Sequence, residues 1–237
     1  MNPRICILLN NLDEFNFGEL LYRYLPIDRF DVEFAVNFPY DPSQFQLIIP
    51  WNYRKIIEQS EQYNNVVVMH SSDLPDGRGW APIYYAFSEG KEWYVMSAIF
   101  AANEVDTGDI IMRARFQIED GYTAHFIRKL DNELTLMLIV KILQQWPEGN
   151  IVGMKQVGVG SYRKRRHPKD NEIDVNNTLV KLIPNLRGIE STGPAFFFYN
   201  SVKYIIEIYP EIQPSMPKKV FIEYPALNKG EIWEGWA

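Results

Sequence analysis

Residues 65–82 read NVVVMHSSDLPDGRGWAP, and this stretch fixes how the rest of the chain is interpreted. Val66–Met69 is a short apolar, β-branched run that predicts a strand. His70 stands at the carboxyl end of this predicted strand, and a turn rich in proline and glycine follows it. In an open α/β sheet, ligands bind in the crevice at the carboxyl ends of the strands. His70 is therefore expected at a ligand-binding edge.

The residues before this strand alternate between two patterns. Short apolar runs predict strands, and a segment with apolar residues at helical spacing lies between two of them. This alternation predicts βαβ units, that is, an α/β fold with a Rossmann-like core and a mostly parallel, twisted sheet. The expected strands are residues 4–9, 31–36, 46–49 and 65–69, and the expected helices are residues 17–25 and 53–62.

The residues after the turn predict a helix over 80–88 and strands over 92–100 and 110–118. Apolar residues at helical spacing then predict a long helix from Thr123, its N-cap, to about Trp146. Pro147 and Gly149 end this helix. We therefore divide the chain into a core of residues 1–148 and a small mixed C-terminal extension of residues 149–237.

Composition excludes several classes of function. The 237 residues carry a net charge of −6, which disfavours a nucleic-acid-coating role. The single cysteine, Cys6, allows no intrachain disulfide and indicates a reducing, cytoplasmic location. The N-terminal apolar run is too short for a signal peptide or a membrane span. No glycine fingerprint for nicotinamide or flavin follows the first strand, and the three histidines are too far apart to predict a metal site.

A second polar element, NEVDTGDI at residues 103–110, lies downstream of the histidine. It places Asp106 in a glycine-containing turn, 36 residues after His70. Asp106 could orient the imidazole or hold a water molecule beside it. Taken singly, each residue is equally typical of a satisfied polar group or of ordinary turn chemistry, so the pattern alone leaves both interpretations open.

Together the two elements resemble the N10-formyltetrahydrofolate-dependent formyltransferases. The H-x-S-x-L-P-x-x-R-G loop of that family is matched over residues 70–79, and its V-D-x-G-x-I element over residues 105–110. The resemblance extends over about residues 65–145 and is weak before them. It implies a formyltransferase core that uses N10-formyltetrahydrofolate as the donor and forms a tetrahedral oxyanion. His70 and Asp106 would be catalytic, with His70 donating to that oxyanion. The pterin would contact mainly backbone groups of Ala102, Asn103, Glu104, Val105 and Asp106.

One position departs from the family pattern. The family carries an asparagine two residues before the histidine, where it helps to polarise the formyl carbonyl, and this chain has Val68 there. Either the enzyme has diverged and uses another donor, or activity has been lost. The intact motif around Arg78 favours activity. Asn103, which we include among the catalytic candidates, or Asn65 could supply the amide.

A basic segment after the long helix is the candidate for binding the acceptor. Residues 161–174 hold five Lys or Arg against three Asp or Glu. This segment is either a solvated basic turn or a diphosphate clamp of Arg163, Arg165 and Arg166. It is similar to a stretch that lies near the acceptor in sugar-modifying family members.

The sequence of residues 72–82 resembles that of the nucleotide-sugar N-formyltransferases of the pseudaminic-acid type. This resemblance implies substrate-binding roles for Arg78 and Trp80. The implied partners are reduced folate and a nucleotide-linked 4-amino-4,6-dideoxy sugar, UDP-linked by preference, in surface-polysaccharide or flagellin sugar biosynthesis. The resemblance is also compatible with a homodimer. The alternatives are a dTDP-amino sugar, an amino acid, a peptide-synthetase substrate, or a decayed folate-binding protein.

Overall fold

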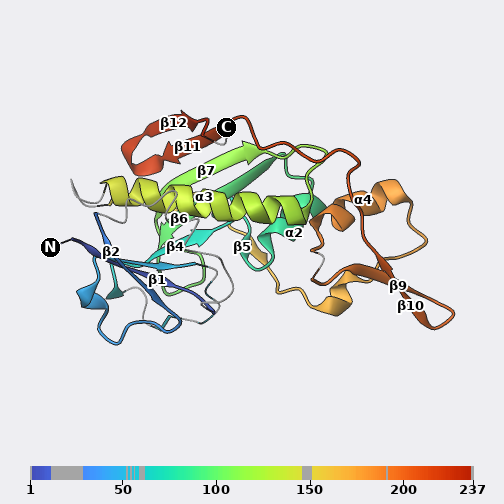
Figure 1. Ribbon diagram of the computed structural model, residues 1–237, viewed down its shortest axis with the longest axis horizontal. Coiled ribbons are helices and arrows are strands. Elements are labelled where there is room, and N and C mark those ends of the chain that lie inside the picture. Colours follow the sequence, from blue (N-terminus) through green and yellow to red (C-terminus); the bar gives the residue numbers. More distant parts are fainter. Residues whose placement is uncertain are drawn as a thin grey trace.

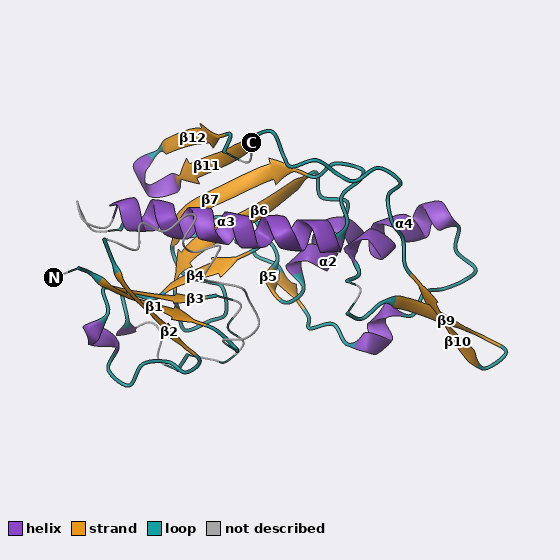
Figure 2. Ribbon diagram, in the orientation of Figure 1, coloured by secondary structure: helices purple, strands orange, loops and turns teal. Residues whose placement is uncertain are grey.

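A long helix lying across a twisted sheet dominates the computed structural model (Figure 1). The structure describes residues 2–11, 29–51, 53, 55, 57–58, 62–145, 151–190 and 192–235. The N-terminal strands lie on one side of the long helix, and a two-stranded hairpin projects at the far end of the molecule (Figures 1 and 2). None of the described helices is long and apolar enough to cross a membrane.

The N-terminal strands form the parallel part of the fold. β1 (Arg4–Leu8) pairs in parallel with β2 (Asp31–Ala35) on one side and with β3 (Leu47–Pro50) on the other. β3 is buried throughout, which is typical of a strand covered on both faces. The predicted helix at 17–25 lies outside the described residues, and most of the predicted helix at 53–62 does as well.

The second half of the sheet is antiparallel, whereas we expected a mostly parallel sheet. A parallel bridge between Ile48 and Val66 connects β3 to β4 (Val67–His70). From β4 onward the order is β4-β6-β7-β11-β12, with every pair antiparallel. β6 (Trp93–Phe100) and β7 (Ile110–Gln117) are joined by a short turn, and a connection of that length can join only antiparallel neighbours. The α/β, Rossmann-like class is confirmed, but the sheet is mixed.

The long helix α3 (Ala124–Gln145) covers this sheet and begins as predicted, with Ile127 N donating to Thr123 O (2.9 Å). Its apolar residues share a core with β6 and β7, including the fully buried Leu130, Leu134 and Leu138. A shorter helix, α2 (Pro82–Ser88), follows the turn after β4 and packs against α4 (Leu179–Gly188). Three 3₁₀ turns complete the described helices, at Pro42–Gln44, Pro168–Asn171 and Pro225–Leu227.

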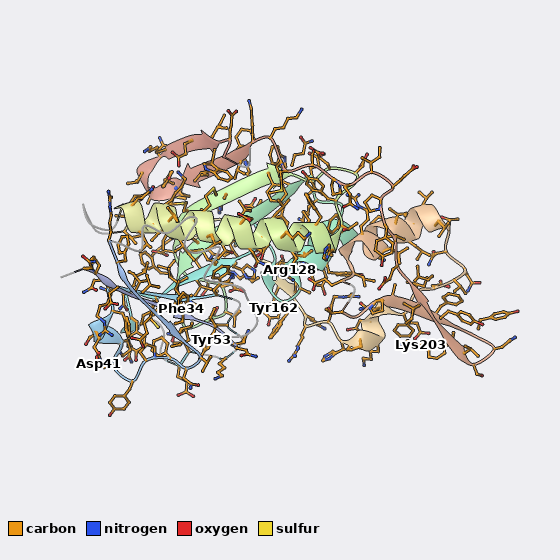
Figure 3. The ribbon with its side chains drawn as sticks, in the orientation of Figure 1. Phe34, Asp41, Tyr53, Arg128, Tyr162 and Lys203 are labelled. Atoms are coloured by element: carbon orange, nitrogen blue, oxygen red, sulfur yellow. The ribbon has the colours of Figure 1, made fainter. Side chains whose placement is uncertain are left out.

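The C-terminal extension contributes both to the core and to a small cluster of its own. β11 (Val220–Tyr224) pairs with β7 and continues into β12 (Lys229–Trp233), so these two strands widen the main sheet. The hairpin of β9 (Ala195–Tyr199) and β10 (Val202–Ile206) stands apart and packs with α4 through a separate apolar cluster. Figure 3 labels Lys203 on this hairpin. The division at residue 149 stays a prediction, with the last two strands inside the main sheet.

We expect Ile222→Ala to show that β11 belongs to the main core. Ile222 is 1% exposed and lies opposite Ala114 of β7, so its truncation should lower the free energy of unfolding by about 2–5 kcal/mol. Ile205→Ala, on the hairpin where the residue is 54% exposed, is the matched control and should change stability by less than about 0.5 kcal/mol. Denaturant unfolding of both variants checks this, and equal effects would contradict it.

Candidate active site

His70 closes β4 and is buried, with 8% of its surface exposed. β4 pairs with β6 so that His70 lies opposite Ser97, which fixes the backbone from which the imidazole projects. The ring nitrogen Nε2 lies 2.9 Å from the carbonyl oxygen of Gly77. A carbonyl oxygen can only accept, so Nε2 carries a hydrogen in this arrangement. The predicted histidine is therefore held at a strand end, as expected.

Asp106 meets His70 from the turn between β6 and β7. Its Oδ2 lies 3.3 Å from Nδ1 of His70 and accepts a hydrogen bond from the backbone N–H of Gly79 (2.8 Å). The Asp106 backbone is left-handed, with φ of 57°, a conformation that aspartate tolerates better than most residues. The structure thus joins the two motifs that the sequence placed 36 residues apart.

Gly108 explains why this turn needs glycine. A side chain at this position would collide with the backbone carbonyl of Phe100. The same close approach lets the Phe100 N–H donate to Asp109 O (3.0 Å). The D-T-G motif therefore encodes a tight crossing of backbone segments that holds Asp106 against the end of β4.

Gln156 clamps this turn, and sequence reasoning did not single it out. Its Nε2 donates to the carbonyl oxygens of Asp106 (2.8 Å) and Gly108 (2.9 Å). Its Oε1 accepts from Nη2 (2.7 Å) and Nε (3.3 Å) of Arg78. One amide thereby ties the Asp106 turn to the loop after His70. Arg78, predicted to bind substrate, is engaged in this clamp.

The loop after His70 is also held by the C-terminal extension. β5 (Arg78–Gly79) pairs in parallel with β8 (Tyr162–Arg163), and the Gly77 N–H donates to Oγ of Ser161 (2.8 Å). A side chain at Gly79, where φ is 97°, would approach the Arg163 carbonyl oxygen to 2.5 Å. Gly79 is therefore required for this pairing, which also presents its N–H to Asp106.

The position of the missing family asparagine is apolar. Val68 packs against a small cluster formed by Leu74, Ile99 and Ile110. Asn65, one of the proposed replacements, donates through its amide to the carbonyls of Pro42 (3.2 Å) and Phe45 (2.7 Å), at the opposite end of the strand from His70. Asn103 is exposed in the connection that carries Asp106. Asn65 thus lies away from His70, and Asn103 as the source of the amide stays a prediction.

A cavity of about 540 Å³ opens beside Gly79. Trp80 and Tyr84 line it, with the guanidinium of Arg165 4.8 Å above the Trp80 ring and that of Arg166 3.4 Å above the Tyr84 ring. Arg128 of α3 also lines it, and Figure 3 labels this residue together with Tyr53, another lining residue. The cavity thus combines three guanidinium groups with aromatic faces.

Arg163 is separated from the other two arginines of the basic segment. Its guanidinium forms ion pairs with Glu89 (2.7 Å) and Asp76 (3.4 Å), and it lines a different cavity of about 380 Å³. Hydrogen bonds from Lys91 and Ser161, with ion pairing to Lys91 and Arg163, lower the pKa of Asp76, so this carboxyl remains charged. Arg163 therefore fixes the β8 segment, while Arg165 and Arg166 line the cavity next to Gly79.

Residues 32–141 match the family model described as formyl transferase. Methionyl-tRNA formyltransferase from Rickettsia massiliae is 30% identical over 133 residues, which cover 56% of this chain and 43% of that protein. The chain thus spans about half the length of the curated relatives it matches.

Solved structures share the fold over most of the chain. Methionyl-tRNA formyltransferase from Clostridium thermocellum is 21% identical, with a TM-score of 0.71 over 99% of this chain and 100% of that one. A sugar N-formyltransferase from a Shewanella species is 16% identical, with a TM-score of 0.70 over 90% and 99% of the two chains. The formyltransferase PseJ from Anoxybacillus kamchatkensis, solved with UDP-4,6-dideoxy-4-formamido-L-AltNAc and tetrahydrofolate, is 20% identical, with a TM-score of 0.58 over 70% and 88%.

We expect Gln156→Leu to destabilise the site while preserving side-chain size. The change leaves the carbonyls of Asp106 and Gly108 without their donor, which should cost about 1–3 kcal/mol. Gln117→Ala, at an exposed position of β7, is the control and should have little effect. Hydrogen exchange of the Gly79 N–H should rise in Gln156→Leu, because the Asp106 turn loses its clamp. Unchanged exchange would show that the turn is held by its backbone alone.

Proposed function

We propose that the protein transfers the formyl group of N10-formyltetrahydrofolate to the amine of a nucleotide-linked 4-amino-4,6-dideoxy sugar, with UDP as the favoured nucleotide. The observation that carries this proposal is the buried pair of His70 and Asp106 next to a cavity lined by arginines and aromatic rings. Gly79 connects the two features, because it lines the cavity and donates its N–H to Asp106.

The reaction needs an anion-stabilising donor and a route for one proton. The amine nitrogen bonds to the formyl carbon, the bond from that carbon to N10 breaks, and a proton moves from the amine to N10. The carbonyl oxygen becomes an oxyanion in the tetrahedral intermediate, and one well-placed donor there contributes about 3 kcal/mol. In the free protein, Nε2 of His70 donates to Gly77 O. Release of this bond on substrate binding frees Nε2–H for the oxyanion, and Asp106 retains the ring and relays the proton through water.

The donor side is assigned to the turn before Asp106. Asn103, Glu104 and Val105 are exposed, and the Val105 side chain is 56% exposed. An exposed aliphatic group beside backbone N–H and C=O groups suits a flat heteroaromatic ring with hydrogen-bonding edges. We assign Ala102, Asn103, Glu104, Val105 and Asp106 to the pterin on this basis, with Asn103 as the side-chain amide nearest in sequence to Asp106.

The acceptor side is assigned to the cavity with Arg165 and Arg166. A guanidinium that lies over an aromatic face keeps the N–H groups at its own edge available for phosphate oxygens. Arg166 uses part of this capacity on the Asp170 carbonyl and on Asn171 Oδ1, both at 2.6 Å. Arg165 makes no side-chain hydrogen bond to the described residues, so it is the stronger candidate for a diphosphate.

The curated relatives favour methionyl-tRNA as a second candidate acceptor, since those matched by sequence are methionyl-tRNA formyltransferases. A net charge of −6 works against tRNA binding, and the cavity has the size of a small-ligand site. Assay of the purified protein with N10-formyltetrahydrofolate against UDP-amino sugars, dTDP-amino sugars and methionyl-tRNA distinguishes the candidates. Formylation of methionyl-tRNA alone would overturn the sugar assignment.

We expect His70→Asn to fold and to lose transfer. The variant removes the ring nitrogens that face Gly77 and Asp106, and we expect kcat to fall by about 10²–10³ as for loss of one oxyanion donor. Circular dichroism and thermal unfolding check the fold, and steady-state assay measures kcat. A folded variant that retains more than about a tenth of wild-type kcat would contradict the catalytic role of His70.

We expect Arg165→Gln to raise the KM for the nucleotide sugar and to leave the KM for the formyl donor unchanged. Loss of a charge-assisted contact to phosphate costs about 1.5–3 kcal/mol, or roughly 10- to 150-fold. Arg166→Gln should have a smaller effect, because protein groups share its N–H donors. Arg163→Gln is the matched control in the same segment and should change stability more than KM, since Arg163 pairs with Glu89 and Asp76. A wild-type KM for the nucleotide sugar in all three variants would mean that the diphosphate binds elsewhere.

A further inference from the structure

A buried carboxylate on α3 lies behind the catalytic histidine. Asp131 is only 4% exposed, and its Oδ1 accepts hydrogen bonds from Ser71 Oγ and Tyr94 OH, each at 2.5 Å. Burial, reinforced by the Asp131 carboxylate, raises the pKa of Tyr94 well above its usual range, so the phenol remains a donor. Ser71 directly follows His70. One side chain of α3 is therefore tied to the strand end that presents the imidazole.

The second oxygen of the same carboxylate contacts an arginine that lines the acceptor cavity. Oδ2 of Asp131 lies 3.6 Å from Nη1 of Arg128, one helical turn earlier, and Arg128 lines the cavity with Arg165 and Arg166. The outer end of Arg128 pairs with Glu190 at 2.5 Å. Burial disfavours the charge on Arg128, but Asp131 and Glu190 outweigh it and raise the pKa of Arg128. Arg128 is thus a fixed cation at the cavity wall.

The two halves of Asp131 make it a branch point between the cavity and the histidine. We propose that Asp131 is a positioning residue that holds His70 through Ser71 and holds Arg128 as a third cation for the acceptor diphosphate. This inference rests on the proposed function, because it assigns the Arg128 cavity to the nucleotide. It concerns residues outside both sequence motifs.

Charge on Asp131, more than its shape, is what this arrangement requires. Two hydroxyl donors and a guanidinium converge on the carboxylate, and an amide would present one N–H₂ group to partners that are themselves donors. Without the negative charge, Glu190 would be the remaining anion next to Arg128 and would draw it toward the cavity rim. Ser71 would keep only a neutral amide oxygen as its acceptor, with a weaker hydrogen bond. The turn at the end of β4 would then depend more on the bond from Ser72 N to His70 O (2.9 Å) and on the bond from Ser97 Oγ to Ser72 O (2.7 Å).

The experiment separates the two arms of Asp131 with single variants. Ser71→Ala removes only the arm to His70, Arg128→Gln removes only the arm to the cavity, and Asp131→Asn removes the negative charge that strengthens both. Tyr94→Phe is the control, because it removes a buried hydrogen bond to the same Asp131 oxygen that reaches neither site. Calorimetric titration with UDP gives Kd, steady-state assay gives kcat, and thermal unfolding gives stability for each variant.

The expected result is a distinct split. Arg128→Gln raises the Kd for UDP by about tenfold or more, as for one lost charge-assisted bond, with little change in kcat. Ser71→Ala lowers kcat several-fold at unchanged Kd. Asp131→Asn does both, and Tyr94→Phe lowers the melting temperature while leaving Kd and kcat near wild type.

Two results would overturn the inference. One is wild-type Kd and kcat in Asp131→Asn, and the other is a Tyr94→Phe variant that loses as much of both as Asp131→Asn does, which would reduce Asp131 to core stability. Failure of the proposed function has a different signature. Wild-type protein that binds UDP and formylates no nucleotide sugar contradicts the proposed function. In that case the Kd values of the variants for UDP still test the link between Asp131 and Arg128.

Discussion

The contact between Asp106 and His70 brings the two motif loops of the candidate site together. It requires the end of β4 and the turn between β6 and β7 to meet at one edge of the sheet, within 3.3 Å at Oδ2 and Nδ1. The turn meets this requirement in a left-handed backbone at Asp106, which costs roughly 1–2 kcal/mol in an L-residue. The missing side chain of Gly108 and the amide of Gln156 offset that cost. If the two residues act as proposed, their geometry is preorganised before substrate arrives.

The basic segment shows how neighbouring like charges acquire different tasks. Arg163 is neutralised by Glu89 and Asp76 and secures the strand that pairs with the loop after His70. Arg165 and Arg166 instead lie over Trp80 and Tyr84, where stacking holds a guanidinium without consuming its charge. A protein of net charge −6 can therefore present a local cationic cavity, because the acidic partners are placed under one arginine and away from the other two.

Sequence reasoning predicted what local patterns encode. The strands up to β7, with the exception of β5, and the long helix follow from apolar periodicity, which acts over a few residues. The joining of His70 to Asp106 is suggested by the two motifs and by their resemblance to one family. The antiparallel half of the sheet, Gln156 and Asp131 could not be predicted in the same way. A lone glutamine or a lone aspartate on a helix carries no periodic signal, and its partners lie up to 60 residues away for Asp131 and 78 for Gln156. Charge counting likewise cannot separate Arg163 from Arg165, because only tertiary contacts distinguish them.

Val68 supplies no hydrogen-bond donor, so any donor to the oxyanion has to come from other residues. An apolar cluster of Leu74, Ile99 and Ile110 surrounds the position where an amide would help to polarise the formyl carbonyl. One missing oxyanion donor is worth about 3 kcal/mol, a loss that an active enzyme has to make up from groups on the same edge of the sheet. Asn65 is committed to the carbonyls of Pro42 and Phe45, whereas Asn103 shares a connection with Asp106. In such an enzyme the oxyanion donors would lie on the β6–β7 turn and no longer on the strand before His70. The position of that turn relative to His70 would then matter more than in an enzyme whose β4 supplies the amide.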